Sequence, residues 1–309
     1  MLADLYARCT KGNETVMTDP FQPFEWALAH GRTLTLGPKG RLMAIINVTP
    51  DSFSDGGSYT ETEAAVSQAL RCIENGAEII DIGGESTRPG AAMVTAVQEQ
   101  DRVLPVISAL ASRTDVIISV DTYRAETASL AVAAGAHIIN DVHGLQREPD
   151  LANVAAETGA GLCIMHTGRD REKLADVVDD QYHFIERSLE IAAAAGVERQ
   201  RIVLDPGFGF AKDTDENVAL MARFDELSGF GLPLLAGTSR KRFLGAITGR
   251  EAQERDAATA ATTALLRIAG AAVFRVHDVA INRDALLVAD AMLAAKRRMP
   301  ERPGKENRP

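Results

Sequence analysis

The sequence predicts an α/β protein whose main body is one (β/α)8 barrel of the TIM type. Eight short aliphatic runs recur along the chain, and segments with the period and composition of helices lie between them. Strand and helix alternate over about 250 residues, which is the usual size of such a barrel. With 309 residues, 46% hydrophobic and 25% charged, the chain has the composition of a soluble globular protein with a large core.

The eight runs are nearly all apolar and do not alternate between apolar and polar residues. Strands that are covered on both faces, as in a parallel sheet, have this pattern. A doubly wound open sheet is the rival fold, but no GxGxxG phosphate-binding motif follows the first run. The predicted strands are residues 42–48 (LMAIINV), 77–83, 115–121, 136–141, 161–166, 201–207, 232–237 and 271–278.

Helical periodicity is clearest in five of the intervening segments. Several of them end in Ala-Gly or Asn-Gly, where glycine can take the left-handed conformation that closes a helix. These segments are residues 61–76, 96–112, 123–135, 182–196 and 254–270.

Two flanks lie outside the predicted barrel, which we place at residues 34–296. Residues 1–33 are a partly ordered N-terminal extension, in which we expect the aromatic and proline residues of FQPFEW to cover one end of the barrel. Residues 297–309 are polar, basic and rich in proline, so we expect a disordered tail.

Charge and hydropathy argue against several classes of protein. The formal net charge of -10 is opposite to the basic face of a general nucleic-acid binder. No apolar stretch approaches the roughly 20 residues that cross a bilayer, and the N-terminus lacks a signal-peptide pattern, so we expect a cytoplasmic protein. Cys9, Cys72 and Cys163 form no CxxC pair and are expected to be ordinary thiols.

Polar or ionisable residues follow all eight predicted strands. Because barrel enzymes build their active sites at the C-terminal ends of the strands, these residues predict one polar pocket. Helix capping or a turn would explain any single Asp, Asn or Ser, but not all eight ends with Arg, Lys and His among them. The residues are Asn47, Glu85, Thr87, Arg88, Asp121, Asn140, Asp141, His166, Asp205, Ser239, Lys241, Arg275 and His277.

The residue types in this ring indicate the ligand. Cations in an acidic protein suggest an anion, and Lys241, Arg275 and His277 follow the seventh and eighth strands, where barrels often bind phosphate. We therefore expect a phosphate or diphosphate group. The acceptors and the amide of Asp121, Asn140 and Asp205 suit a planar heterocycle with several N–H donors.

A zinc site is not indicated, because the sequence has no HExxH motif and no Cys/His cluster at metal spacing. If a metal binds, Mg²⁺ held mostly by diphosphate oxygens suits these residues, with Asn47 as the protein donor. The glycines of DPGFGFAK (205–212) would allow a tight turn that brings Asp205 and Phe210 to the pocket.

Seven motifs together give the sequence a resemblance to the pterin-binding enzyme family. They occur in the family's order and spacing and span about residues 30–295. The motifs are NVTPDSFSDGG (47–57), GAEIIDIGGESTRPG (76–90), SVDTYRAETA (119–128), IND (139–141), LDPGFGFAK (204–212), GTSRKRFLG (237–245) and RVHDV (275–279).

The resemblance implies a barrel enzyme of folate synthesis. It would join 4-aminobenzoate to 6-hydroxymethyl-7,8-dihydropterin diphosphate and release 7,8-dihydropteroate and diphosphate. It would use Mg²⁺ and form a homodimer packed through barrel helices. Diphosphate is a good leaving group once its charge is met, and its departure would leave a cation on the methylene, which describes an SN1-like path.

The resemblance also implies a role for individual residues. The pterin set is Asp121, Asn140, Asp205 and Lys241, and the diphosphate set is Asn47, Arg275 and His277, with Asn47 also on Mg²⁺. The 4-aminobenzoate set is Phe53, Thr87, Arg88, Pro89, Phe210 and Ser239. The catalytic residues would be Asp55, which stabilises the cation, with Lys241, Arg275 and His277. The loops around residues 51–57 and 86–90 would close over the site and exclude water.

Two positions depart from the family pattern. The fifth strand ends in IMHTGRD (164–170), where many members have a further Met and Gly after MH. Arg242 follows Lys241 where some members have Ser.

Three other functions compete with this interpretation. A pterin-family methyltransferase would share the pterin residues but not the SRK and RVHD motifs. A Schiff-base aldolase would use Lys241, with its pKa lowered by Arg240 and Arg242, and would leave the other six motifs unexplained. A binding-only paralogue would not need a leaving-group site, and the intact set of Asn47, Arg88, Lys241, Arg275 and His277 argues against it.

Overall fold

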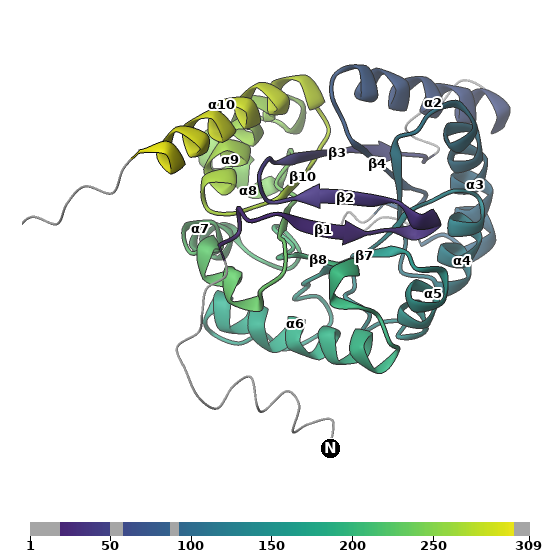
Figure 1. Ribbon diagram of the computed structural model, residues 1–309, viewed down its shortest axis with the longest axis horizontal. Helices are drawn as coiled ribbons and strands as arrows, with labels where there is room; N and C mark the ends of the chain where they lie inside the picture. Colours follow the sequence, from purple (N-terminus) through teal and green to yellow (C-terminus); the bar gives the residue numbers. More distant parts are fainter. Residues whose placement is uncertain (1–18, 50–57, 87–92, 300–309) are drawn as a thin grey trace, which may run out of the picture.

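The computed structural model describes residues 19–49, 58–86 and 93–299. Its main body is a barrel of parallel strands surrounded by helices, as the sequence predicted (Figure 1). The strands pair in the order β8-β7-β6-β5-β4-β3-β10-β9. The ring closes where Leu204 of β8 forms an isolated parallel bridge with Leu234, directly before β9.

Each predicted strand overlaps one strand of the barrel. Almost all of these residues are buried, because helices cover the outside and side chains fill the inside. The strands are β3 (Arg41–Asn47), β4 (Ile79–Gly83), β5 (Ile117–Asp121), β6 (Ile138–Asp141), β7 (Gly161–Met165), β8 (Ile202–Asp205), β9 (Leu235–Ala236) and β10 (Val273–Val276).

The helices bury one apolar face each against the strands. In α3, for example, Val103, Ile107 and Leu110 are fully buried, and a capping box between Thr95 and Gln98 fixes the first turn. The α-helices are α2 (Ser58–Glu74), α3 (Ala96–Arg113), α4 (Ala125–Ala133), α5 (Asp150–Thr158), α6 (Val177–Ala194), α7 (Thr214–Ala222), α8 (Arg242–Thr248), α9 (Asp256–Ile268) and α10 (Val279–Arg298).

An antiparallel hairpin, β1 (Phe24–Ala27) and β2 (Thr33–Leu36), lies across the N-terminal end of the barrel (Figure 1). Trp26 is fully buried in a cluster with Leu36 and with residues at the starts of the barrel strands, such as Met43 and Ile79. The sequence predicted a cover here but no strands, and the hairpin crosses the predicted boundary between residues 33 and 34.

The cysteines and the helices bear on two further expectations from the sequence. Cys72 and Cys163 are free and buried, while Cys9 lies outside the described ranges. Of the helices in the described part of the chain, none is long and apolar enough to span a membrane.

Candidate active site

A buried network of charged and polar side chains forms the floor of the site. Arg275 of β10 reaches past β3, where its Nε donates to Asp81 Oδ2 at 2.6 Å and its Nη2 donates to Asp121 Oδ2 at 2.7 Å. Asn140 on β6 donates to the same Asp81 oxygen at 3.2 Å, and Ser119 donates to the other oxygen at 2.6 Å. The network therefore ties β4, β5, β6 and β10 together.

Asp81 is the residue of this network that the sequence analysis missed. Its side chain is fully buried, in the middle of the strand IIDIG. A buried carboxylate is costly unless a cation or hydrogen-bond donors meet it. Asp81, as the one acidic residue in the apolar strand IIDIG, could therefore have indicated that a cation lies inside the barrel, and this cation is Arg275.

The register of the sheet explains why distant residues meet. Asn47 lies opposite Gly83, Gly83 opposite Asp121, and Asp121 opposite Asn140 on successive strands. All four residues stand at or near the C-terminal ends of parallel strands, so the sheet presents them at one level. Gly83 also leaves room for its neighbour, because a Cβ there would lie 3.4 Å from Cβ of Asp121.

The turn after β8 places Asp205 at the pocket. The backbone N–H of Gly207 donates to Asp205 Oδ1 at 2.7 Å. Gly207 has φ +64°, and a Cβ there would lie 1.9 Å from the carbonyl oxygen of His166, so only glycine fits. The tight turn predicted from DPGFGFAK is confirmed.

Phe210, at the end of the same loop, lies between two cations. Lys241 Nζ is 4.7 Å and Arg169 Cζ is 4.5 Å from the centre of its ring, within the range of cation–π attraction. Lys241 Nζ also donates to the carbonyl oxygen of Phe208. Arg169 belongs to the unusual MHTGRD segment, and its stacking on Phe210 is a contact that this segment makes beside the site.

Ser239 and His277 contact each other at the ends of β9 and β10. Ser239 Oγ and His277 Nδ1 are 2.9 Å apart, and the backbone N–H of His277 donates to the same hydroxyl at 3.1 Å. Ser239 therefore sets the orientation of the imidazole.

Burial shifts the ionisation of these groups. It raises the pKa of Asp121 to about 7 against the opposing charge of Arg275, and it raises the pKa of Asp205 against that of Lys241. Burial lowers the pKa of Lys241 to about 8. Burial also acts to lower the pKa of Arg275, but Asp81 and Asp121 outweigh it and raise that pKa above its ordinary value. Titration near neutral pH is typical of functional sites.

Two residues of the predicted ring are bonded to groups outside the floor network. The carboxylate of Asp141 accepts hydrogen bonds at 2.8 and 2.6 Å from two backbone N–H groups of its own turn. His166 is fully buried, and both of its ring nitrogens contact other side chains. The local turn therefore satisfies Asp141, and neighbouring side chains satisfy His166. Glu85 forms an ion pair with Arg124 at 2.8 Å.

The reason given for a reactive Lys241 is wrong. The largest cause of its lowered pKa is burial, not the arginines beside it in the sequence. The guanidinium of Arg240 instead binds both carboxylate oxygens of Asp256 at 2.7 Å.

Five predicted site residues lie outside the described residues, namely Phe53, Asp55, Thr87, Arg88 and Pro89. Within the described ranges, no group of three or more His, Cys, Asp and Glu side chains could hold a metal ion. Asn47 has a half-buried side chain at the end of β3. An amide oxygen suits Mg²⁺ when phosphate oxygens supply other ligands, so these donors fit the predicted metal.

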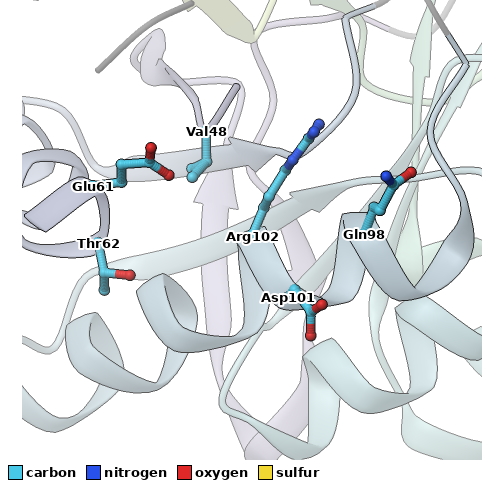
Figure 2. Close-up of a pocket in the computed structure, with 6 residues that line it drawn as sticks. All are labelled: Val48, Glu61, Thr62, Gln98, Asp101 and Arg102. Carbon is cyan, nitrogen blue, oxygen red and sulfur yellow. The ribbon is translucent and has the colours of Figure 1, made fainter. Parts of the chain in front are cut away.

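A separate cavity lies between the end of β3 and the first turns of α2 and α3 (Figure 2). Its volume of about 190 Å³ is below the roughly 300 Å³ of small-molecule sites. None of the predicted site residues lines it, so we place the chemistry in the barrel mouth. The lining residues are Val48, Glu61, Thr62, Gln98, Asp101 and Arg102.

The fold and the site define a (β/α)8-barrel enzyme with buried carboxylates, an amide and paired cations at the strand ends. The family model described as pterin binding enzyme matches residues 43–277, and the chain belongs to this family.

Comparison with individual proteins gives the same result. The chain is 45% identical to the dihydropteroate synthase of Bacillus subtilis (strain 168) over 260 residues, or 84% of this chain and 91% of that protein. It resembles the structure of Xanthomonas albilineans dihydropteroate synthase with 4-aminobenzoic acid (TM-score 0.82, 44% identity, 89% and 100% of the two chains). It also resembles that enzyme in complex with 7,8-dihydropteroate (TM-score 0.79, 42% identity, 89% and 100% of the two chains).

Proposed function

We propose that the protein is a dihydropteroate synthase, which joins 4-aminobenzoate to 6-hydroxymethyl-7,8-dihydropterin diphosphate and releases diphosphate. Relatives of this name at 45% identity and similar structures with 4-aminobenzoic acid and 7,8-dihydropteroate support the proposal. In this chain, the main support for the proposal is the buried network in which Arg275 bridges Asp81 and Asp121. Asp205 at the end of β8 and Lys241 after β9 lie close enough for their charges to interact.

The pterin ring would bind to Asp121, Asn140, Asp205 and Lys241. A pterin presents an amino group and ring N–H groups along one edge, which buried carboxylates can accept in pairs. Asn140 is 2% and Asp205 4% exposed, so water competes little for these hydrogen bonds. Lys241 supplies a donor for the acceptor atoms of the ring.

The diphosphate would lie over Arg275, His277 and Asn47. Arg275 uses Nε and Nη2 for the floor carboxylates, so we assign Nη1 to the diphosphate. His277 is held by Ser239 in a fixed orientation beside it. Mg²⁺, held by the side-chain oxygen of Asn47 and by diphosphate oxygens, would neutralise the charge of the leaving group.

Bond formation would follow an SN1-like path. The C–O bond breaks with its electron pair going to the diphosphate, and the cation forms on the methylene next to the pterin. The neutral arylamine nitrogen then forms the new C–N bond and releases its proton to water. Asp55 would stabilise the cation, with Lys241, Arg275 and His277 as the other catalytic groups. The loops around residues 51–57 and 86–90, which the family resemblance implies exclude water, lie outside the described residues except for Ser86.

A homodimer through the barrel helices would complete the assembly. Large apolar side chains are exposed on two helices that pack together, Leu265 and Ile268 on α9 and Leu287, Val288 and Met292 on α10. Val288 is 72% exposed. Covering such a face with a second copy removes apolar surface from water.

Diphosphate release tests the function directly. The protein is incubated with the pterin diphosphate and Mg²⁺, with and without 4-aminobenzoate, and diphosphate and 7,8-dihydropteroate are measured. The synthase predicts equal amounts of both products, and only when the arylamine is present. Binding of the pterin diphosphate with no release under either condition would instead support a binding-only paralogue.

A further inference from the structure

A buried lysine contacts the turn that follows Asp205. Lys212 is 9% exposed, and its Nζ lies 2.8 Å from His166 Nδ1 and 2.9 Å from the carbonyl oxygen of Gly207. A buried ammonium is costly, and an apolar side chain of similar length would fill the same space without that cost. A lysine at this position therefore calls for a role beyond packing.

The imidazole next to it connects Lys212 to a carboxylate. His166 Nε2 lies 3.0 Å from Asp180 Oδ2, and Arg171 binds both oxygens of Asp180 at 2.9 and 2.6 Å. Burial lowers the pKa of His166 to about 4, so its ring is neutral at pH 7. The ammonium of Lys212 can only donate, so Nδ1 accepts from it and the proton of the neutral ring is on Nε2, which faces Asp180 Oδ2 and also lies 2.9 Å from Arg171 Nη2.

The other contact of Lys212 leads to the substrate site. Lys212 holds the carbonyl of Gly207, and the N–H of the same glycine donates to Asp205 Oδ1 at 2.7 Å. His166 adds a backbone bond, because its N–H donates to the carbonyl of Asp205 at 2.8 Å. Gln181 donates to the carbonyl of Pro206 at 3.1 Å. The carbonyl oxygens of all three residues from 205 to 207 therefore accept a hydrogen bond from outside the turn or from Lys212.

The charge of Lys212 acts on the same carboxylate. Burial raises the pKa of Asp205, and Lys212 is one of the groups whose positive charge opposes that rise. Burial also lowers the pKa of Lys212 to about 7, so its positive charge acts on Asp205 below this pH and is lost as the pH rises through it. The pterin donors need Asp205 as an ionised acceptor. The charged and titratable groups around Asp205 and Lys212 are Lys241, Arg275, Cys163, His166, Arg171, Lys173 and Asp180.

We propose that Lys212 is a positioning residue for the pterin site, which acts with His166 and Asp180 to hold the Asp205 turn and to keep Asp205 ionised. Lys212 touches no reacting atom in this account. The inference rests on the proposed function, because it assigns Asp205 to the pterin.

The test replaces Lys212 with Met and compares it with Lys173→Met. Lys173 provides a matched control, since its ammonium also contacts this loop, at the carbonyl of Ala211 at 2.8 Å, but from the outer side, beside Glu216. For Lys212→Met we expect KM for the pterin diphosphate to rise about tenfold, the effect of one charge-assisted hydrogen bond, with a smaller change in kcat. Lys173→Met should retain the wild-type KM.

The pH profile separates this role from a purely structural one. Without the ammonium the pKa of Asp205 rises further, so the acid limb of kcat/KM should move to higher pH. Lys212→Arg keeps a positive donor and should return the limb toward its wild-type position. If Lys212→Met does not fold, Lys212→Gln gives the same neutralisation with a polar side chain.

Three results are distinguishable. An inactive wild-type protein would refute the proposed function. The role of Lys212 would be overturned if the wild type is active and the folded neutral variant, Lys212→Met or Lys212→Gln, keeps the wild-type KM and the wild-type acid limb of kcat/KM. A shift in both quantities that Lys212→Arg reverses and Lys173→Met does not show would support it.

Discussion

At the residue scale, one guanidinium fixes the positions of two carboxylates. Arg275 binds Asp81 and Asp121 with separate nitrogens, and Ser119 and Asn140 also donate to Asp81. Such a network is costly to break, because removal of one partner leaves the other buried and uncompensated.

Substitution of Asp81 tests this dependence. Asp81→Asn has nearly the same shape but removes the charge that meets Arg275, and we expect the free energy of unfolding to fall by about 3 kcal/mol. Urea denaturation followed by circular dichroism measures this change. Glu63→Gln, in the exposed pair with Arg113 at 2.7 Å, should lower the free energy of unfolding much less than Asp81→Asn, because solvent screens that pair. If the free energy of unfolding falls equally in Asp81→Asn and Glu63→Gln, the charge of Asp81 does not contribute more to stability than an exposed charge does.

The ionisation of Lys241 should limit the activity at high pH. Its pKa is lowered to about 8 by burial, so the ammonium is present below this pH and is lost as the pH rises through it. We expect kcat/KM for the pterin diphosphate to decline over that range. In Lys241→Arg the charge persists, so the decline should be absent even if the overall rate is lower. A wild-type profile that stays flat to pH 10 would show that the charge of Lys241 is not required.

At the scale of elements, apolar runs and glycine-containing turns could be predicted, but the hairpin could not. The eight strands appear in the sequence because each is covered on both faces and is therefore continuously apolar. The hairpin β1–β2 has mixed burial along each strand, so its short runs gave no clear period. It forms because Trp26 and Leu36 complete a core that the barrel strands leave open at one end.

Substitution of Trp26 tests how much the hairpin contributes to the stability of the barrel. Trp26→Ala removes a fully buried ring and the hydrogen bond from its Nε1 to the carbonyl of Arg201 at 2.8 Å. We expect a loss of about 3–5 kcal/mol in the free energy of unfolding. Thr33→Ala, at an exposed position of the other strand, should change it by no more than about 0.5 kcal/mol. Loss of less than about 1 kcal/mol in Trp26→Ala would mean that the hairpin contributes little to the barrel.

At the scale of the whole molecule, the barrel could be predicted, but the group that each polar residue at a strand end contacts could not. Asp121 and Asp141 both end a strand, yet only Asp121 meets Arg275, whereas Asp141 is satisfied by the N–H groups of its own turn. The difference depends on backbone directions after the strand. Asp81 and Lys212 were overlooked for a related reason, because their partners are far away in the sequence.

The proposed homodimer predicts the mass of the molecule in solution. One chain is 33.1 kDa, so light scattering should give about 66 kDa, twice that value. Val288→Glu on α10 places a charge in the proposed interface and should shift the mass toward the monomer. Val97→Glu, at a position of α3 that is 63% exposed, is the matched control and should stay dimeric. A monomeric wild-type protein would rule out this assembly.

We propose that the barrel mouth binds the pterin on the ends of β5, β6 and β8, and a crystal structure with 6-hydroxymethyl-7,8-dihydropterin bound would test this. We expect the amino and ring N–H groups to lie within hydrogen-bond distance of Asp121 and Asp205, with Asn140 and Lys241 at the same ring. A pterin bound elsewhere, for example in the cavity beside Glu61 and Arg102, would contradict it.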